Sequence, residues 1–207
     1  MTECLIRAAT VNDREAAFDV CLKTGNHGDD GTRYYAEDPD ALGRIFVGPY
    51  LELEPRFSLI LEDSEGVCGY ALGALDSRAF YARYERDCRP ILCARFPEPH
   101  GEPRAWTRLQ QAYHTYHHPD YFCPDPYDVY PSHLHIDLLP RARGRGYGQR
   151  MIEKLMDGFR AHGSSGAHLG VSALNARARG FYGRLGFQEL TRAGFGDDEC
   201  IYMGRRT

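Results

Sequence analysis

The residues that could do chemistry gather first in a stretch rich in glycine and arginine. Residues 143–148 read RGRGYG, and Arg141 and Arg150 lie on either side of them. Glycines allow tight turns and bring bare backbone amides close to a ligand. If a helix begins here, those amides lie at its N-terminus, where the partial positive charge favours phosphate. We therefore predict a diphosphate-binding loop, and an ordinary tight turn with solvated arginines is the alternative. The stretch lacks the motifs of nucleoside triphosphatases and dinucleotide folds.

A second group lies just before this loop, in the segment His133–Leu139. Side chains alternate across a strand, so the segment has an apolar face and a polar face. The polar face consists of His133, His135 and Asp137. Such a row of titratable groups leading to the loop predicts proton handling. Asp137 is nearest the loop and is the predicted general base, directly or through water, with His135 as its partner or as an alternative base. A solvated strand face would also explain the pattern.

Hydrophobic periodicity and turn residues indicate the elements that position these groups. Strands are expected at 4–8, 57–61, 67–75, 133–139, 167–171, 187–191 and 199–203. Helices are expected after the Thr10–Asp13 capping box, from Asp38-Pro39 to Gly48-Pro49, at 147–162 and at 175–185. This order indicates an α/β (α+β) fold with a mixed central sheet flanked by helices.

Residues 76–131 form a long insertion between the third and fourth strands. It is rich in proline and tyrosine, holds the single tryptophan, and could form helices at 80–89 and 106–116. An insertion of this kind within one compact domain usually lines or covers a site, so we expect it to form the lid of the acceptor site.

Composition excludes several classes of protein. The net charge of −4 argues against electrostatic binding of nucleic acid over a broad surface. No apolar run is long enough for a membrane helix, and the N-terminus lacks the pattern of a secretory signal, so we expect a cytoplasmic protein. The seven cysteines show no Cys-x-x-Cys spacing, and the histidines at 114, 117 and 118 have no acidic or cysteine partner in register. We therefore expect reduced thiols and no metal site.

Two motifs carry a resemblance. An Arg-x-x-Gly-x-Gly pattern within residues 141–148, directly after a strand, resembles the coenzyme A loop of the GNAT acetyltransferases. Residues 175–187, which read NARARGFYGRLGF, are similar to that family's Asn-x-x-Ala-x-x-Phe-Tyr-x-x-x-Gly-Phe segment and lie at the right distance from the loop. The resemblance implies a single GNAT domain over residues 1–207.

A closer resemblance links the chain to the acetyltransferase-like domains found at the C-terminus of eukaryotic O-GlcNAcases. Its segments are 48–51, 53–55, 69–76 and 130–137, so it covers nearly the whole chain. It implies a free-standing bacterial relative without a glycosidase. The eukaryotic domains depart from the Arg/Gly loop, whereas this chain keeps it, and we therefore expect acetyl-CoA to bind.

The resemblance also assigns roles to residues. The coenzyme-binding residues it implies are Leu138, Leu139, Arg143, Gly144, Arg145, Gly146, Tyr147, Gly148, Gln149, Asn175 and Tyr182. The backbone of Leu138 and Leu139 would pair with the pantetheine arm, and Asn175 would cap its helix and also touch that arm. Tyr182 would lie close to the coenzyme sulfur and protonate the leaving thiolate, although its helical spacing also fits core packing.

These observations predict an acetyl-CoA-dependent N-acetyltransferase that works by direct attack in a ternary complex, without an acetyl-enzyme. Its amine acceptor, a small molecule or a protein lysine, is not readable from the sequence, and a homodimer is possible. One alternative is a catalytically silent module that binds acetyl-CoA. Another is a homodimeric scaffold that binds no coenzyme.

Overall fold

The computed structural model describes residues 3–119, 121, 128–194, 196 and 199–207. They form a seven-stranded sheet in the order β1-β2-β3-β4-β5-β7-β6. The strands are β1 (Leu5–Ala8), β2 (Ser58–Asp63), β3 (Gly66–Ala74), β4 (Ser132–Leu138), β5 (Gly166–Ser172), β6 (Gln188–Ala193) and β7 (Cys200–Arg206). Neighbouring strands are antiparallel except β4 and β5, which are parallel, so the predicted mixed sheet is confirmed.

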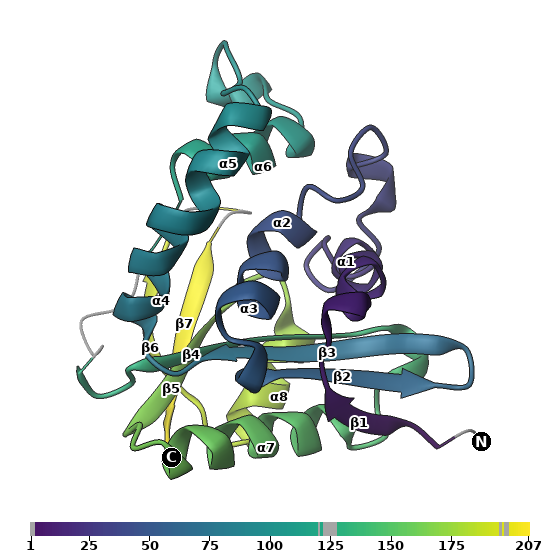
Figure 1. Ribbon diagram of the computed structural model, residues 1–207, viewed down its shortest axis with the longest axis vertical. Coiled ribbons are helices and arrows are strands. Elements are labelled where there is room, and N and C mark those ends of the chain that lie inside the picture. Colours follow the sequence, from purple (N-terminus) through teal and green to yellow (C-terminus); the bar gives the residue numbers. More distant parts are fainter. Residues whose placement is uncertain (1–2, 120, 122–127, 195, 197–198) are drawn as a thin grey trace.

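Helices cover both faces of this sheet (Figure 1). The α-helices are α1 (Arg14–Leu22), α2 (Gly43–Phe46), α3 (Gly48–Leu53), α4 (Ser77–Arg83), α5 (Arg89–Arg95), α6 (Arg108–His117), α7 (Tyr147–Ala161) and α8 (Ala176–Arg184). A π-helical turn (Tyr84–Cys88) joins α4 to α5, and short 3-10 turns lie at Val11–Asp13, Thr32–Tyr34, Pro55–Phe57, Pro103–Ala105 and Pro140–Ala142. Figure 1 shows α1 and α3 on one face and α7 on the other.

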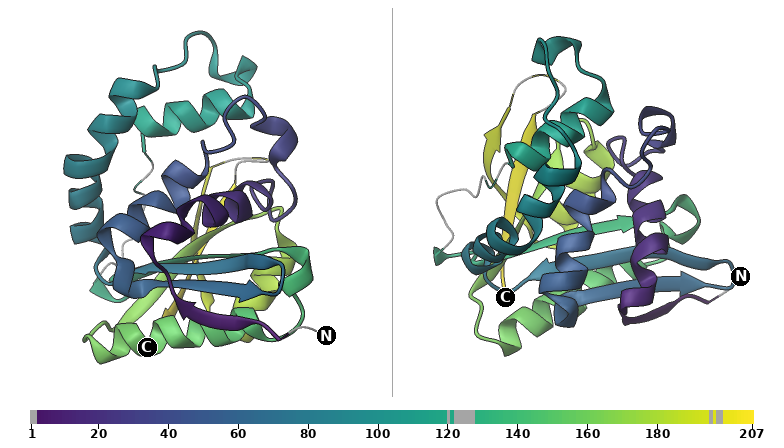
Figure 2. Two further views of the ribbon diagram at one scale, coloured as in Figure 1. Left: turned by 45° about the vertical axis from the view of Figure 1, so that its right-hand side comes forward. Right: turned by 45° about the horizontal axis from the view of Figure 1, so that its top comes forward.

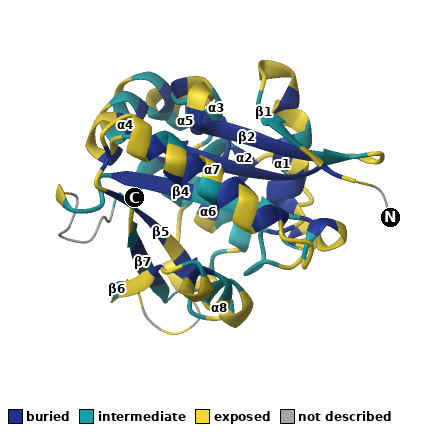
Figure 3. Ribbon diagram, turned by 90° about the horizontal axis from the view of Figure 1, so that it is seen from below, coloured by how far each residue is buried: buried dark blue, intermediate teal, exposed yellow. Residues whose placement is uncertain are grey.

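The longest helix, α7, packs through the apolar stripe expected from its sequence. Figure 3 shows buried and exposed residues alternating along it, and the buried ones include Met151, Ile152, Leu155, Met156 and Phe159. The stripe lies close to β3. A Cβ atom added at Gly73 would meet the Phe159 ring at 2.5 Å. This contact explains why β3 carries small residues, since a larger side chain would push the helix off the sheet.

One predicted boundary is wrong. Gly48-Pro49 was expected to end a helix that opened at Asp38-Pro39, but α2 ends at Phe46 and the pair begins α3 instead. Proline lacks a backbone N–H and its ring fixes φ near the helical value, so it fits the first turn of a helix. The same two residues therefore mark a start as readily as a stop.

The insertion after β3 forms an arm that rises from the sheet and leans on the segment before α2 (Figure 2). The hydroxyl of Tyr116 on α6 donates to the Ala41 carbonyl at 2.8 Å, and that of Tyr113 donates to the Asp38 carboxylate at 2.9 Å. Both expected helices of the insertion are present, the first one extended by α5. In the described part of the chain, no helix is long and apolar enough to span a membrane.

The two parallel strands at the centre of the sheet separate almost at once. β4 and β5 pair only at Ser132–Ala167 and His133–His168 among the described residues. β4 then continues against β3 as far as Leu138, while β5 continues against β7 as far as Ser172. The later half of β4 therefore has a backbone edge without a neighbouring strand.

Candidate active site

Asp137, the predicted base, is held by a side chain from the neighbouring strand. Tyr70 on β3 lies directly opposite Asp137 in the β3–β4 register, and its hydroxyl donates to Asp137 Oδ2 at 2.7 Å. Directly opposed residues of neighbouring strands share a face of the sheet, which explains the contact. Sequence analysis missed Tyr70 as a site residue. The available signal was an aromatic residue flanked by Gly69 and Ala71 on the strand expected to precede the insertion.

His135 completes this cluster. Its Nε2 atom lies 3.0 Å from the Tyr70 hydroxyl oxygen and 3.2 Å from Asp137 Oδ2. Because the single Tyr70 proton goes to Asp137, the hydrogen-bond network assigns a proton to Nε2 of His135. His135 thus donates to the Tyr70 oxygen, Tyr70 donates to Asp137, and this chain of hydrogen bonds fixes the carboxylate in place.

Two further groups around this carboxylate stay protonated. Tyr70 is fully buried, and burial, reinforced by the charge of Asp137, raises its pKa well above the ordinary value of 10. Cys21 on α1 offers its sulfur within 4.8 Å of the ligand atoms of His135 and Asp137. Burial and the same negative charge raise the pKa of Cys21, so it is a neutral thiol and not a nucleophile.

His133 shares the strand face but not the cluster. It is buried, its Nδ1 contacts the Ser77 hydroxyl at 2.8 Å, and its ring stacks on Tyr81 of α4 at 5.1 Å. Burial lowers its pKa well below 6.5, which keeps the ring neutral. The structure therefore brings together two of the three predicted strand residues, and the third packs under the insertion.

Tyr182, the predicted acid, lies on α8 and is 7% exposed. Its ring packs between Phe181 and Phe187, with ring centroids 5.4 and 5.9 Å away. Burial, followed by the negative charge of Asp137, raises the pKa of Tyr182. The phenol is therefore protonated at neutral pH and available as a donor.

The glycines of the predicted diphosphate loop have two different roles. Gly144 and Gly146 have φ angles of 72° and 80°, and a Cβ atom at either would meet nothing within 4 Å. These glycines permit left-handed backbone and leave open space above the loop. Gly148 instead allows close packing, because a Cβ there would lie 3.1 Å from Leu138 and 3.2 Å from Phe181. Gly146 is the N-cap of α7, so the loop does end at a helix N-terminus.

The other loop side chains differ in exposure. Tyr147 is buried, and its hydroxyl accepts the Cys4 N–H at 2.9 Å, which ties the N-terminal strand to α7. The guanidinium groups of Arg145 and Arg150 lie over the Tyr147 ring at 5.3 and 5.4 Å from its centroid. Gln149 is exposed. The arginines therefore surround the start of α7 with positive charge.

Arg143 turns back toward the sheet. It donates to the Leu138 carbonyl through Nε and to the Gly28 carbonyl through Nη2, both at 2.7 Å. The Leu139 N–H donates to the backbone carbonyl of Cys68 on β3 at 2.8 Å. Because successive backbone groups of a strand point in opposite directions, the Leu138 groups face the gap between β4 and β5. A pocket of about 350 Å³ lies beside this point, lined by residues of the 28–30 and 139–143 segments and by Lys23.

Asn175 caps α8 as expected, since its side chain accepts the Ala178 N–H at 3.0 Å. Its amide group also lies beside Gly28, where a Cβ atom would come within 2.7 Å of Nδ2. The segment around Gly28 therefore closes over the region between β4 and α8. His27 supports this arrangement through a 2.9 Å contact with Ser172 at the end of β5.

Comparison with known proteins places the chain among acetyltransferases. The family model described as the acetyltransferase (GNAT) family matches residues 29–187. Protein O-GlcNAcase of Mus musculus and that of Rattus norvegicus are each 25% identical over 202 residues, which is 97% of this chain. The chain spans only 22% of the length of these two curated relatives.

Solved structures extend the comparison. The crystal structure of SsHAT is 36% identical, covers 99% of this chain and 98% of its own, and superimposes with a TM-score of 0.86. The structure of yncA from Salmonella typhimurium with its cofactor acetyl-CoA has a TM-score of 0.52 at 16% identity, over 98% of this chain and 93% of that one. At that identity the likeness concerns the fold.

Proposed function

Because the chain belongs to the GNAT acetyltransferase family, we propose that it transfers the acetyl group of acetyl-CoA to an amine by direct attack in a ternary complex. Family and fold support acetyl transfer with acetyl-CoA as cosubstrate. The observation that supports an amine acceptor and direct attack is the position of Asp137. It lies on β4, whose free edge leads to the glycine loop, and it is held by Tyr70 and His135.

The loop and the strand edge fit the coenzyme. Acetyl-CoA supplies a thioester, a diphosphate and a pantetheine arm with amide groups. The open space over Gly144 and Gly146, at the start of α7, suits the diphosphate. The Leu138 backbone suits a pantetheine amide, and Arg143 would then exchange its bond to the Leu138 carbonyl for a bond to the ligand.

The proton steps fall to two residues. Asp137 would take the proton that the amine loses on attack, directly or through one water. Tyr182 would give its proton, or a hydrogen bond, to the departing sulfur. Burial and, to a smaller extent, the charge of Asp137 raise the pKa of Tyr182, so the two steps would be coupled. Once Asp137 is protonated that charge disappears, and Tyr182 becomes a stronger acid when the sulfur needs a proton.

The acceptor would approach from the side of α2. Phe46 of this helix stacks on His135 at 5.5 Å and remains 41% exposed, so it forms an apolar surface beside the base. Three other polar residues have structural roles: Tyr35 and Tyr84 are buried, and Asp76 caps α4. The acceptor class stays open between a small amine and a protein lysine. A cytoplasmic location and a homodimer stay predictions from the sequence.

Calorimetric titration with acetyl-CoA, followed by thiol release over a panel of amines, tests this proposal. We expect saturable binding and turnover of at least one amine. Binding without turnover on any acceptor would identify a silent acetyl-CoA module. An absence of binding, with no rise in melting temperature at high acetyl-CoA, would favour a scaffold, since a ligand at 100 times its Kd should stabilise by about 2.7 kcal/mol.

A further inference from the structure

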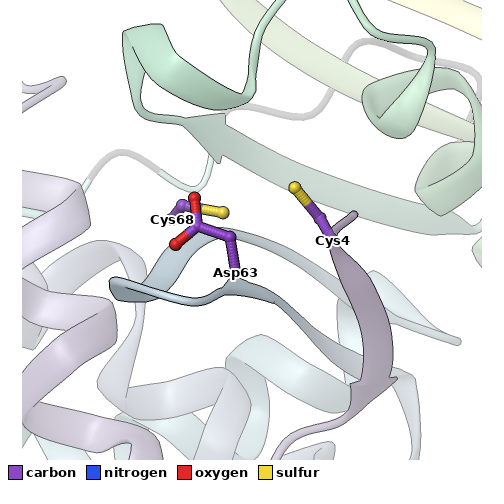
Figure 4. A group of neighbouring side chains, drawn as sticks. All are labelled: Cys4, Asp63 and Cys68. Atoms are coloured by element: carbon purple, nitrogen blue, oxygen red, sulfur yellow. The ribbon is translucent and has the colours of Figure 1, made fainter. Parts of the chain in front are cut away.

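A group of side chains of the types that ligate metals lies outside the candidate active site, where β1 meets the β2–β3 hairpin. Cys4 precedes β1, Asp63 ends β2 and Cys68 lies in β3. The two sulfurs and a carboxylate oxygen all lie within 4.8 Å of one another. Figure 4 shows both sulfurs directed into the space between the strands, with the Asp63 carboxylate beside Cys68. We propose that these three side chains bind a thiophilic divalent cation such as Zn²⁺.

Strand pairing explains how residues so far apart in sequence meet. Leu5 pairs with Glu62, which brings the preceding Cys4 beside Asp63. On the other side, Leu61 pairs with Gly69 and Glu62 pairs with Val67, so Cys68 is the extra residue of a β-bulge. A bulge changes the direction of a side chain and is a recurrent feature of binding sites. Here it accompanies a thiol that lies within reach of the other two ligands.

The ligand types suit zinc better than the hard cations. Two thiolates and a carboxylate form three-quarters of a tetrahedral zinc site, with Zn–S distances of about 2.3 Å and Zn–O distances of about 2.0–2.2 Å. Ligand atoms around such an ion lie roughly 3.5–3.8 Å apart, so the side chains would close in slightly. Cys4 also lines a surface pocket of about 490 Å³, through which an ion and a fourth, water ligand could enter.

The surroundings balance the charge of such a site. Asp63 accepts the Glu65 N–H through Oδ1 at 2.9 Å and Arg141 Nε through Oδ2 at 3.0 Å. Arg145 Nη1 lies 3.6 Å from the Cys4 sulfur. Two thiolates, a carboxylate and a divalent cation together carry one negative charge, which these arginines compensate. Since Arg145 belongs to the diphosphate loop and Arg141 lies just before it, the ion would also connect that loop to the N-terminal strand.

Two other groups of possible ligands lie among the described residues. Cys21, His135 and Asp137 form one, but they belong to the candidate active site. Glu98, His114 and His118 form the other, in which Glu98 is an acidic partner that the sequence did not reveal. That group is largely exposed and holds no thiol. These two groups provide controls.

Titration of the reduced full-length protein with Co²⁺ tests the proposal. We expect one Co²⁺ per chain with a sulfur-to-cobalt charge-transfer band and the intense visible bands of tetrahedral Co²⁺. Cys4→Ser and Cys68→Ser should each weaken the charge-transfer band and the double variant should lose it, whereas Cys21→Ser, Cys93→Ser and His118→Ala should keep it. Saturating Zn²⁺ should raise the melting temperature of the wild type and not that of the Cys4→Ser/Cys68→Ser variant.

X-ray absorption of the Zn²⁺-loaded wild type keeps the test decisive if a variant fails to fold. We expect two sulfur neighbours at about 2.3 Å, with the remaining neighbours oxygen. A first shell of nitrogen and oxygen alone would overturn the proposal. So would a charge-transfer band that persists in the Cys4→Ser/Cys68→Ser variant, or one that disappears in Cys21→Ser. None of these measurements uses acetyl transfer, so their outcome is independent of the proposed function.

Discussion

The hydroxyl of Tyr70 donates a 2.7 Å hydrogen bond to the carboxylate of Asp137 from the directly opposite position on β3. The proposed base is thus held by a residue of another strand, 67 positions away along the chain. Its position depends on the register of the sheet as much as on its own strand.

Replacement of Tyr70 by Phe should therefore lower kcat without a matching loss of acetyl-CoA affinity. A hydrogen bond to a charged group contributes about 1.5–3 kcal/mol, and His135 Nε2, which lies 3.2 Å from the same carboxylate, would replace part of it, so we expect a loss of roughly 10-fold. Steady-state kinetics would contradict this role if kcat stayed unchanged.

The alternation of the 133–139 segment was enough to predict that His135 and Asp137 share a side, because strand periodicity is a local property. Tyr70 could not be predicted in the same way, because its contact depends on the pairing of distant strands. His133 follows the alternation correctly, yet Tyr81 and Ser77 of the insertion bury it. The local alternation of the sequence thus predicted which side chains share a face of the strand. Tertiary packing determined which of those side chains are accessible.

The cysteines also make contacts that depend on the pairing of distant strands and could not be predicted from the sequence. The absence of Cys-x-x-Cys predicted no metal site, but that spacing detects only ligands that are close in sequence. Cys4 and Cys68 meet through β1–β2 pairing and a bulge in β3. The six described cysteines are free, and four of them are buried. The seventh, Cys123, lies outside the described residues.

Arg143→Ala tests the diphosphate loop. Loss of a guanidinium that would contact a charged group should raise the Kd for acetyl-CoA by about 10- to 100-fold. Arg160→Ala, at the far end of α7, is the matched control, because Arg160 is exposed and forms an ion pair with Asp157 of the same helix. Calorimetry that found tighter binding to Arg143→Ala would mean that Arg143 obstructs the β4 edge.

Gly146→Ala tests how backbone conformation, as distinct from side-chain packing, affects the stability of the protein. The φ of 80° is unfavourable for any residue with a Cβ, and the space around this position is open, so we expect a loss of about 1–2 kcal/mol in unfolding free energy. Gly183→Ala in α8 is the control, since that Cβ also meets nothing within 4 Å but the backbone is helical. It should stabilise by up to about 1 kcal/mol. If urea denaturation showed the same change in unfolding free energy for both variants, the left-handed backbone at Gly146 would not be the cause.

The stability of the protein should fall in acid partly because of Asp13. Hydrogen bonds from Arg7, the closest at 2.6 Å, and then from Thr10 lower the pKa of this carboxyl from 3.8 to about 2. A lowered pKa in the folded state stabilises at pH values above 3.8, and that contribution of about 2 kcal/mol disappears as the pH falls toward 2. Asp13→Asn should thus destabilise most above pH 5 and least near pH 2. A difference that does not vary with pH would contradict this.

The most direct test of the account is the comparison of wild type and Asp137→Asn in paired assays of acetyl-CoA binding and turnover of an amine found in the panel. Asn keeps the size of the side chain but cannot accept the proton. We expect the Kd for acetyl-CoA to stay within about threefold, while kcat falls by about 10²–10⁴-fold. Asp157→Asn, an exposed carboxylate of α7, should leave both unchanged. Turnover by Asp137→Asn at the wild-type rate would contradict the role of Asp137 as the base.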